Sequence, residues 1–83
     1  MSWIQRRQTI LNKIVITLNQ ADKLNTKIPK NALIAEVCLE FGSSRKKVME
    51  YIKILLDSKR VKETWDRKDT YLEINKLSVE LDL

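Results

Sequence analysis

Apolar residues recur at helical spacing through the first part of the chain. Between residues 3 and 18 they include Ile4, Ile10, Leu11, Ile14, Val15 and Leu18. Steps of three and four predict an amphipathic helix from Trp3 to about Leu18. Its apolar stripe is about 140° wide, broader than the roughly 100° that a surface helix needs. Trp3 and Ile10 lie together on one flank of the stripe, which makes that flank a candidate surface for a partner.

A polar connection follows at residues 22–31 and contains the only proline, Pro29. Because the residue before a proline avoids helical conformation, a short extended segment is predicted around Lys27 and Ile28. Pro29 suits the first turn of a second helix, and Gly42 suits its left-handed C-terminal end. The apolar face of this second helix is Leu33, Ile34, Val37, Cys38 and Phe41.

Ser43 and Ser44 supply an N-cap for a third helix. Its apolar face is Val48, Tyr51, Ile52, Leu55 and Leu56. After Ser58 the pattern changes to two short runs rich in β-formers, "RVKETW" and "TYLEI", which predict a hairpin. The turn that joins them, residues 66–69, contains neither Gly nor Asn. Residues 75–83 fit either a short extra element or a tail.

The predicted order, α-β-α-α-β-β, describes one small α+β domain over residues 1–83. It resembles the winged-helix variant of helix-turn-helix proteins, with three helices and a C-terminal β-hairpin wing. The resemblance covers residues 28–74 and is carried by "IPKNALIAEVCLEFGSSRKKVMEYIKILLDSKRV" and the hairpin. The sequence departs from many such wings because its turn has no glycine, which leaves the length and flexibility of the wing open.

The resemblance implies a double-stranded DNA-binding protein, most simply a small transcriptional regulator. The third helix (44–58) would then lie in the major groove, and the wing (61–74) would lie on the backbone or in the minor groove. The DNA-binding residues carried over by position are Ser44, Arg45, Lys46, Lys47, Glu50, Lys53, Arg67 and Lys68. Winged helices also serve as protein-interaction modules within larger assemblies, so that function is the alternative.

Charge is distributed unevenly along the chain, whose net charge is +5. Residues 43–68 carry nine basic and four acidic groups, and the first turn of the third helix holds Arg45, Lys46 and Lys47 together. Cations at a helix N-terminus oppose the helix dipole, whereas the free N–H groups there attract phosphate. The cluster therefore indicates an anion site, and an ordinary solvated surface is the alternative. Glu50 could accept from a cytosine amino group or pair with Lys46 or Lys53.

Aromatic residues on the wing, Trp65 and Tyr71, could stack on bases of a single strand. With so few aromatics in the chain, packing against the core or sheet is the favoured interpretation. Isolated domains of this size bind DNA weakly, so a homodimer is expected. Its candidate interfaces are the flank with Trp3 and Ile10, or the C-terminal tail.

Several function classes are disfavoured by composition. The chain has no histidine and one glycine, so it lacks the commonest general base and a glycine-rich phosphate loop. No zinc or EF-hand spacing is present, and we expect no catalytic residue, metal or cofactor. Cys38, the only cysteine, excludes an intrachain disulfide and suits a reducing, cytoplasmic location as a buried small side chain. No apolar run approaches the roughly 20 residues that span a membrane.

Overall fold

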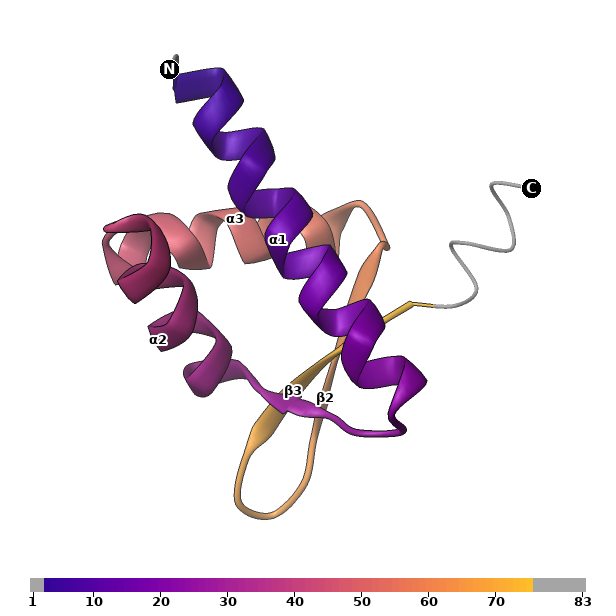
Figure 1. The fold of residues 1–83 in the computed structure, drawn as a ribbon. Coiled ribbons are helices and arrows are strands. Elements are labelled where there is room, and N and C mark those ends of the chain that lie inside the picture. The colour runs from indigo at the N-terminus through magenta and orange to yellow at the C-terminus, as the bar shows by residue number, and fades with distance from the viewer. Residues whose placement is uncertain (1–2, 76–83) are drawn as a thin grey trace, which may run out of the picture.

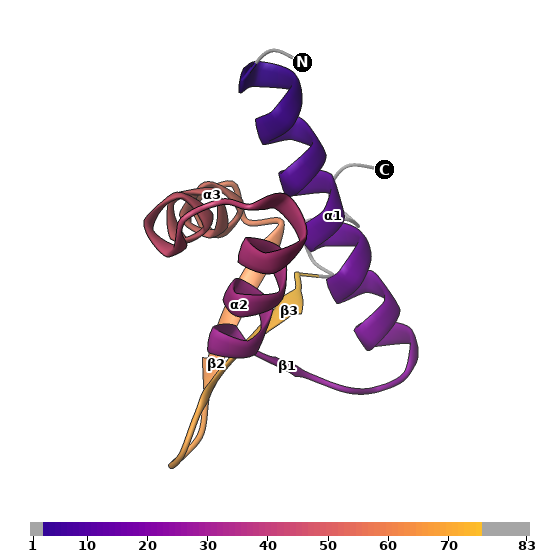
Figure 2. The same ribbon diagram turned by 60° about the vertical axis from the view of Figure 1, so that its left-hand side comes forward.

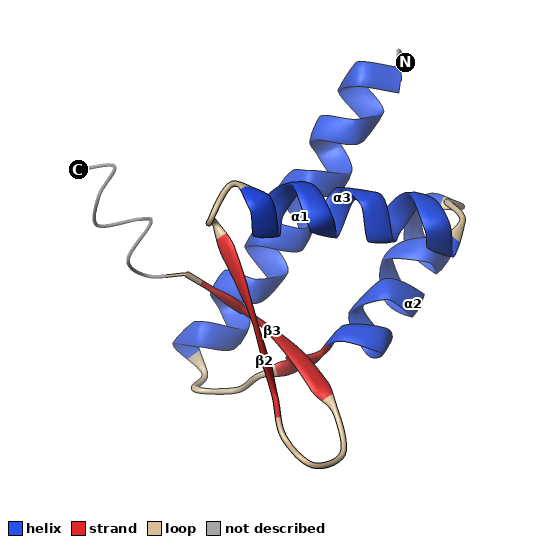
Figure 3. Cartoon of the chain, turned by 180° about the vertical axis from the view of Figure 1, so that it is seen from behind, coloured by secondary structure: helices blue, strands red, loops and turns tan. Residues whose placement is uncertain are grey.

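The computed structural model describes residues 3–75. It confirms the predicted small α+β domain, with three helices and a C-terminal antiparallel hairpin (Figures 1 and 3). The elements are α1 (Trp3–Lys23), β1 (Ile28–Pro29), α2 (Lys30–Phe41), α3 (Arg45–Asp57), β2 (Val61–Trp65) and β3 (Thr70–Ile74). This arrangement is compatible with a winged helix.

The hairpin belongs to a three-stranded antiparallel sheet of order β1-β3-β2. Ile28 pairs with Leu72, which ties the segment before α2 to the central strand. The hairpin itself aligns Val61 with Ile74 and Trp65 with Thr70. Because alternate residues of a strand point to the same side, β3 sends Leu72 and Ile74 together into the core.

The core lies where the three helices meet one face of the sheet. Its buried side chains are Ile10, Leu11, Ile14, Leu18, Leu33, Ile34, Val37, Val48, Ile52, Leu55, Val61, Leu72 and Ile74. Cys38 and Phe41 pack against this cluster and are half-buried. Helix α1 contacts α2, α3 and β3, so it needs a wide apolar stripe for packing alone.

That packing corrects one prediction about α1. Ile10 is 0% exposed, so it does not lie on a flank that is free for a partner. The breadth of the stripe reflects contact with helices and sheet on several sides. The side chain of Trp3 and the tail from residue 76 onward, the other predicted interface positions, lie outside the described part of the chain.

Helix α1 also runs further than its apolar spacing predicted, to Lys23 rather than about Leu18. Ala21 is buried and prolongs the packed face. The helix then closes as the N–H groups of Leu24 and Thr26 donate to the Ala21 carbonyl. Asn25 takes a positive φ of 57° at this point, a conformation that Asn tolerates better than most residues.

The turn between α2 and α3 follows the predicted chemistry. Gly42 has φ 64° and ψ 25°, the left-handed conformation that ends α2. Arg6 of α1 donates to the Phe41 carbonyl and, at 3.4 Å, to Ser43 Oγ. The first helix thus holds the turn that orients α3. At the other end of α2, Pro29 stands one residue before the helix, as its N-cap with ψ 133°, rather than inside its first turn.

The hairpin tip projects beyond the helices, as the rotated view shows (Figure 2). At the inner end of the hairpin, Val61, Leu72 and Ile74 are buried, whereas Trp65 at its outer end is exposed. The hairpin is therefore anchored at one end and free at the other, which is the form of a wing.

Candidate nucleic-acid interface

Helix α3 buries one face and presents the opposite one to solvent. Val48, Ile52 and Leu55 enter the core. The exposed face carries Arg45, Lys46, Met49, Glu50 and Lys53. Because residues four apart share a helix face, Arg45, Met49 and Lys53 form one row along α3. This row is mostly cationic and has an apolar centre.

The first turn of α3 is built as the sequence predicted for an N-terminus. Ser44 Oγ accepts from the Lys47 N–H at 3.2 Å, and no acidic residue occupies the turn. Arg45 Nη2 donates to Asn31 Oδ1 of α2 at 2.8 Å. Lys47 Nζ lies 3.8 Å from Glu50 Oε2, so the partner of Glu50 is Lys47 rather than Lys46 or Lys53. The hydrogen bond to Asn31 holds Arg45 against α2, beside the hollow that it lines together with wing residues.

Two adjoining hollows, of about 500 and about 560 Å³, form what we call the α3–wing groove. They share Lys30, Arg45 and Met49. The first lies between α2, α3 and the wing, and its other lining residues are Asn31, Ile34, Trp65, Asp66, Arg67, Lys68, Asp69 and Thr70. The second follows α3, and its other lining residues are Lys46, Glu50, Ile52, Lys53 and Leu56.

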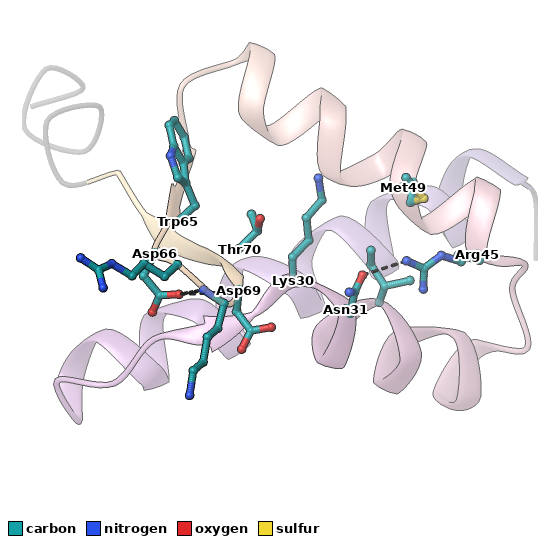
Figure 4. Close-up of a pocket in the computed structure, with 11 residues that line it drawn as sticks. Lys30, Asn31, Arg45, Met49, Trp65, Asp66, Asp69 and Thr70 are labelled. Carbon is teal, nitrogen blue, oxygen red and sulfur yellow. Dashed lines mark hydrogen bonds between the residues drawn. The ribbon is translucent and has the colours of Figure 1, made fainter.

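Lys30 stands at the middle of this groove. Figure 4 shows its side chain between Trp65 on the wing side and Met49 and Arg45 on the α3 side. Its Nζ lies 2.9 Å from Glu63 Oε2, in an ion pair that is only partly exposed. The start of α2 is thereby joined to β2, and the ion pair helps to fix the wall of the groove.

The wing turn closes without glycine. The Asp66 carboxylate accepts from the Lys68 N–H at 2.8 Å and from the Asp69 N–H at 2.9 Å. The Asp66 N–H in turn donates to the Asp69 carbonyl at 3.0 Å. No residue of this turn has a positive φ, so no glycine is required. These contacts hold Arg67 and Lys68 on a defined, short turn.

Two side chains at the wing have shifted pKa values. The N–H groups of Asp69 and Lys68 lower the pKa of Asp66 below its ordinary 3.8, because they stabilise the carboxylate. Burial, followed by a hydrogen bond with Asp66, raises the pKa of Tyr71 above its ordinary 10.0. Both shifts therefore favour the same state of the wing, in which the Asp66 carboxylate is ionised and the Tyr71 hydroxyl keeps its proton.

The interpretation that Trp65 packs on the core or sheet is wrong. Its side chain is 74% exposed, because β2 has passed the edge of the core by this residue. Tyr71, on the neighbouring strand, is half-buried. The wing thus offers a large aromatic surface to the groove at Trp65.

The structure brings together most of the predicted site residues. Arg45 of α3 lines the same hollow as Arg67 and Lys68 of the wing. Lys46, Glu50 and Lys53 line the second hollow along α3, whereas Ser44 and Lys47 line neither. The sequence reasoning missed Lys30, Asn31 and Met49 as lining residues, and it considered Trp65 only for stacking on a single strand. Met49 had a signal, since it lies four residues from both Arg45 and Lys53.

Among residues 3–75, no group of three His, Cys, Asp or Glu side chains could hold a metal ion. None of the described helices is both long and apolar enough to cross a membrane. Comparison of the chain with protein-family models, curated proteins and solved structures gave no match.

Proposed function

We propose that this protein is a winged-helix, double-stranded DNA-binding protein of the cytoplasm that acts as a small transcriptional regulator. In this proposal α3 enters the major groove, which admits an α-helix. The wing turn with Arg67 and Lys68 lies along the sugar-phosphate backbone or in the neighbouring minor groove. Binding alone provides the function, and no catalytic step is involved.

One observation supports the proposal above all: cations from separate elements converge on a single open groove. Arg45 comes from α3, Lys30 from α2, and Arg67 and Lys68 from the wing, yet all four line one hollow. Acidic Asp66 and Asp69 also line it, so its four cations exceed its carboxylates by two. A groove with positive rims suits two strands of phosphates.

The cations at the start of α3 also favour a polyanionic ligand. Each one costs the free protein about 0.3–1 kcal/mol against the helix dipole. A phosphate placed there would meet the free N–H groups, the dipole and the side chains together. The arrangement costs stability in the free protein and stabilises the complex.

The test is fluorescence anisotropy of a labelled random-sequence duplex at about 50 and about 200 mM salt, the range in which phosphate contacts respond strongly. We compare the wild type with a Lys46→Ala, Lys53→Ala variant, which removes two cations from the groove. A Lys13→Ala, Lys23→Ala variant removes the same charge from α1 and is the matched control.

Wild-type binding should weaken steeply with salt. Loss of two phosphate contacts should lower the slope of log K against log salt by about 1.8 in the groove variant. The control should keep most of the wild-type slope. Equal losses in the two variants would contradict a localised interface, and no binding at about 50 mM salt would refute the function.

A protein-interaction module is the second candidate, and exposed apolar side chains outside the groove favour it. Leu39 on α2 is 87% exposed, and Ile4 on α1 is 57% exposed. Exposed Ile4 lies near the N-terminal end of α1, and we propose a homodimer through that end or through the C-terminal tail, which doubles the DNA contacts. Sedimentation of the protein alone and with duplex measures the copies per DNA; one copy in both would exclude the dimer.

A further inference from the structure

Met49 is an apolar residue at the centre of the charged face of α3. Arg45 and Lys53 lie one turn to either side of it, and Lys46 and Glu50 lie alongside. Its side chain is 43% exposed. A cationic surface that needed only solubility would gain nothing from an apolar side chain at this point.

Met49 also occupies the place where the two hollows of the α3–wing groove meet, because it lines both. The other apolar residues of the hollow along α3 are less accessible: Ile52 is buried and Leu56 is half-buried. Across the groove, exposed Trp65 lines the wing side. Met49 is thus the apolar group of α3 that a ligand in the groove would touch first, between cations that hold phosphates.

The chemistry of base edges limits what such a side chain can read. In the major groove, each base pair presents its own pattern of donors and acceptors, and thymine adds a C5-methyl group. A thioether side chain forms at most weak hydrogen bonds, so it discriminates bases chiefly through apolar contact. Thymine is the base that offers an apolar group on that edge.

We propose that Met49 determines part of the DNA sequence preference by packing on the C5-methyl group of a thymine in the major groove. This inference rests on the proposed function and specifies what α3 reads. The flanking cations position the helix on phosphates, which carry no sequence information directly. Met49 supplies a contact that depends on the base.

The experiment uses a duplex that the wild-type protein selects from a randomised pool. The selected duplex is synthesised twice, once with thymine and once with uracil at every thymine position. The two have the same charge and the same hydrogen-bonding groups and differ only in the methyl groups. Burial of one methyl group should make the wild type bind the thymine duplex about fourfold more tightly.

Three variants assign the effect to Met49. Met49→Ala should bind the uracil duplex as the wild type does and lose the preference for thymine. Met49→Leu, which keeps an apolar side chain, should retain the preference. Ile54→Ala is the matched control, because Ile54 is a similarly exposed (41%) apolar residue of α3 that lines a different hollow, beside α1. It too should retain the preference.

The outcomes separate the inference from the function on which it rests. Equal wild-type affinity for the two duplexes, a preference that survives in Met49→Ala, or a pool that yields no preferred sequence would overturn the role of Met49 and leave DNA binding standing. No binding to any duplex at low salt would overturn both. A fourfold preference lost only in Met49→Ala supports the inference.

Discussion

Ser44 offers a way to separate the stability of α3 from its attraction for phosphate. Its Oγ accepts the Lys47 N–H at 3.2 Å and is the side-chain cap of the helix. In Ser44→Ala this acceptor is lost, and helix caps of this kind contribute about 1 kcal/mol. For a domain of this size, that should lower Tm by roughly 4–8 °C. Net charge does not change and Ser44 lines neither hollow of the groove, so the folded variant should keep the salt dependence of wild-type binding.

Ser44→Asp should do the reverse. The carboxylate can still cap the helix, and it meets a favourable dipole and the cations Arg45, Lys46 and Lys47. Stability should therefore equal or exceed that of the wild type. A phosphate about 4 Å from the new charge would be repelled by about 1 kcal/mol in water, which is roughly a fivefold loss of affinity. The loss should shrink as salt screens the charges.

Thermal unfolding followed by circular dichroism, together with anisotropy at low and high salt, measures both effects. The two variants should give opposite results. Ser44→Ala should be less stable and bind normally, whereas Ser44→Asp should be stable and bind more weakly. Unchanged low-salt affinity in Ser44→Asp would refute an anion site at this helix end. Unchanged Tm in Ser44→Ala would refute the cap.

Three further predictions concern the turn after α2 and the wing. Gly42→Ala places a Cβ in open space, so its cost of about 1 kcal/mol comes from the left-handed backbone alone, and urea unfolding should show a smaller loss for Gly42→Asn. Because the pKa of Asp66 is lower in the folded protein, the ionised carboxylate stabilises the fold above pH 3.8, and this stabilisation is lost as pH falls through the lower folded pKa. Asp66→Asn should remove this acid sensitivity, which unfolding measured against pH would show. Because the pKa of Tyr71 is higher in the folded protein, the protonated hydroxyl stabilises the fold below pH 10.0, and this stabilisation is lost as pH rises through the folded pKa. Ultraviolet titration in a Tyr51→Phe background should then find Tyr71 ionising above 10.0.

Local chemistry is what the sequence predicted best. Gly42, Ser44 and the change from helical to alternating spacing after Ser58 each act within a few residues, and each prediction was confirmed. Ile10 and Trp65 were misjudged because their burial depends on distant elements. Ile10 is buried where α1 meets the other helices and the sheet. Trp65 is exposed because β2 extends beyond the core.

The candidate site was predictable only as far as it lies on single elements. The row of cations on α3 follows from helical geometry, but no spacing in the sequence joins Lys30 to the wing. That contact depends on the packing of α2 against β1 and β3 of the sheet, which leaves Lys30 Nζ 2.9 Å from Glu63 Oε2. Met49 has the same helical spacing as Arg45 and Lys53, but charge does not predict it as a DNA contact because its side chain is apolar.

The central position of β3 has a consequence for how the chain acquires its structure during synthesis. Leu72 and Ile74 complete a core whose other side chains begin at Ile10, and Ile28 pairs only with this late strand. At roughly 5–20 residues per second, the ribosome takes about 3 to 10 seconds to pass from the end of α1 to β3. Through that interval the apolar faces of the helices have no sheet to cover them. The domain therefore folds only once β3 has been made, and the hairpin that forms the wing is also the part that completes the core.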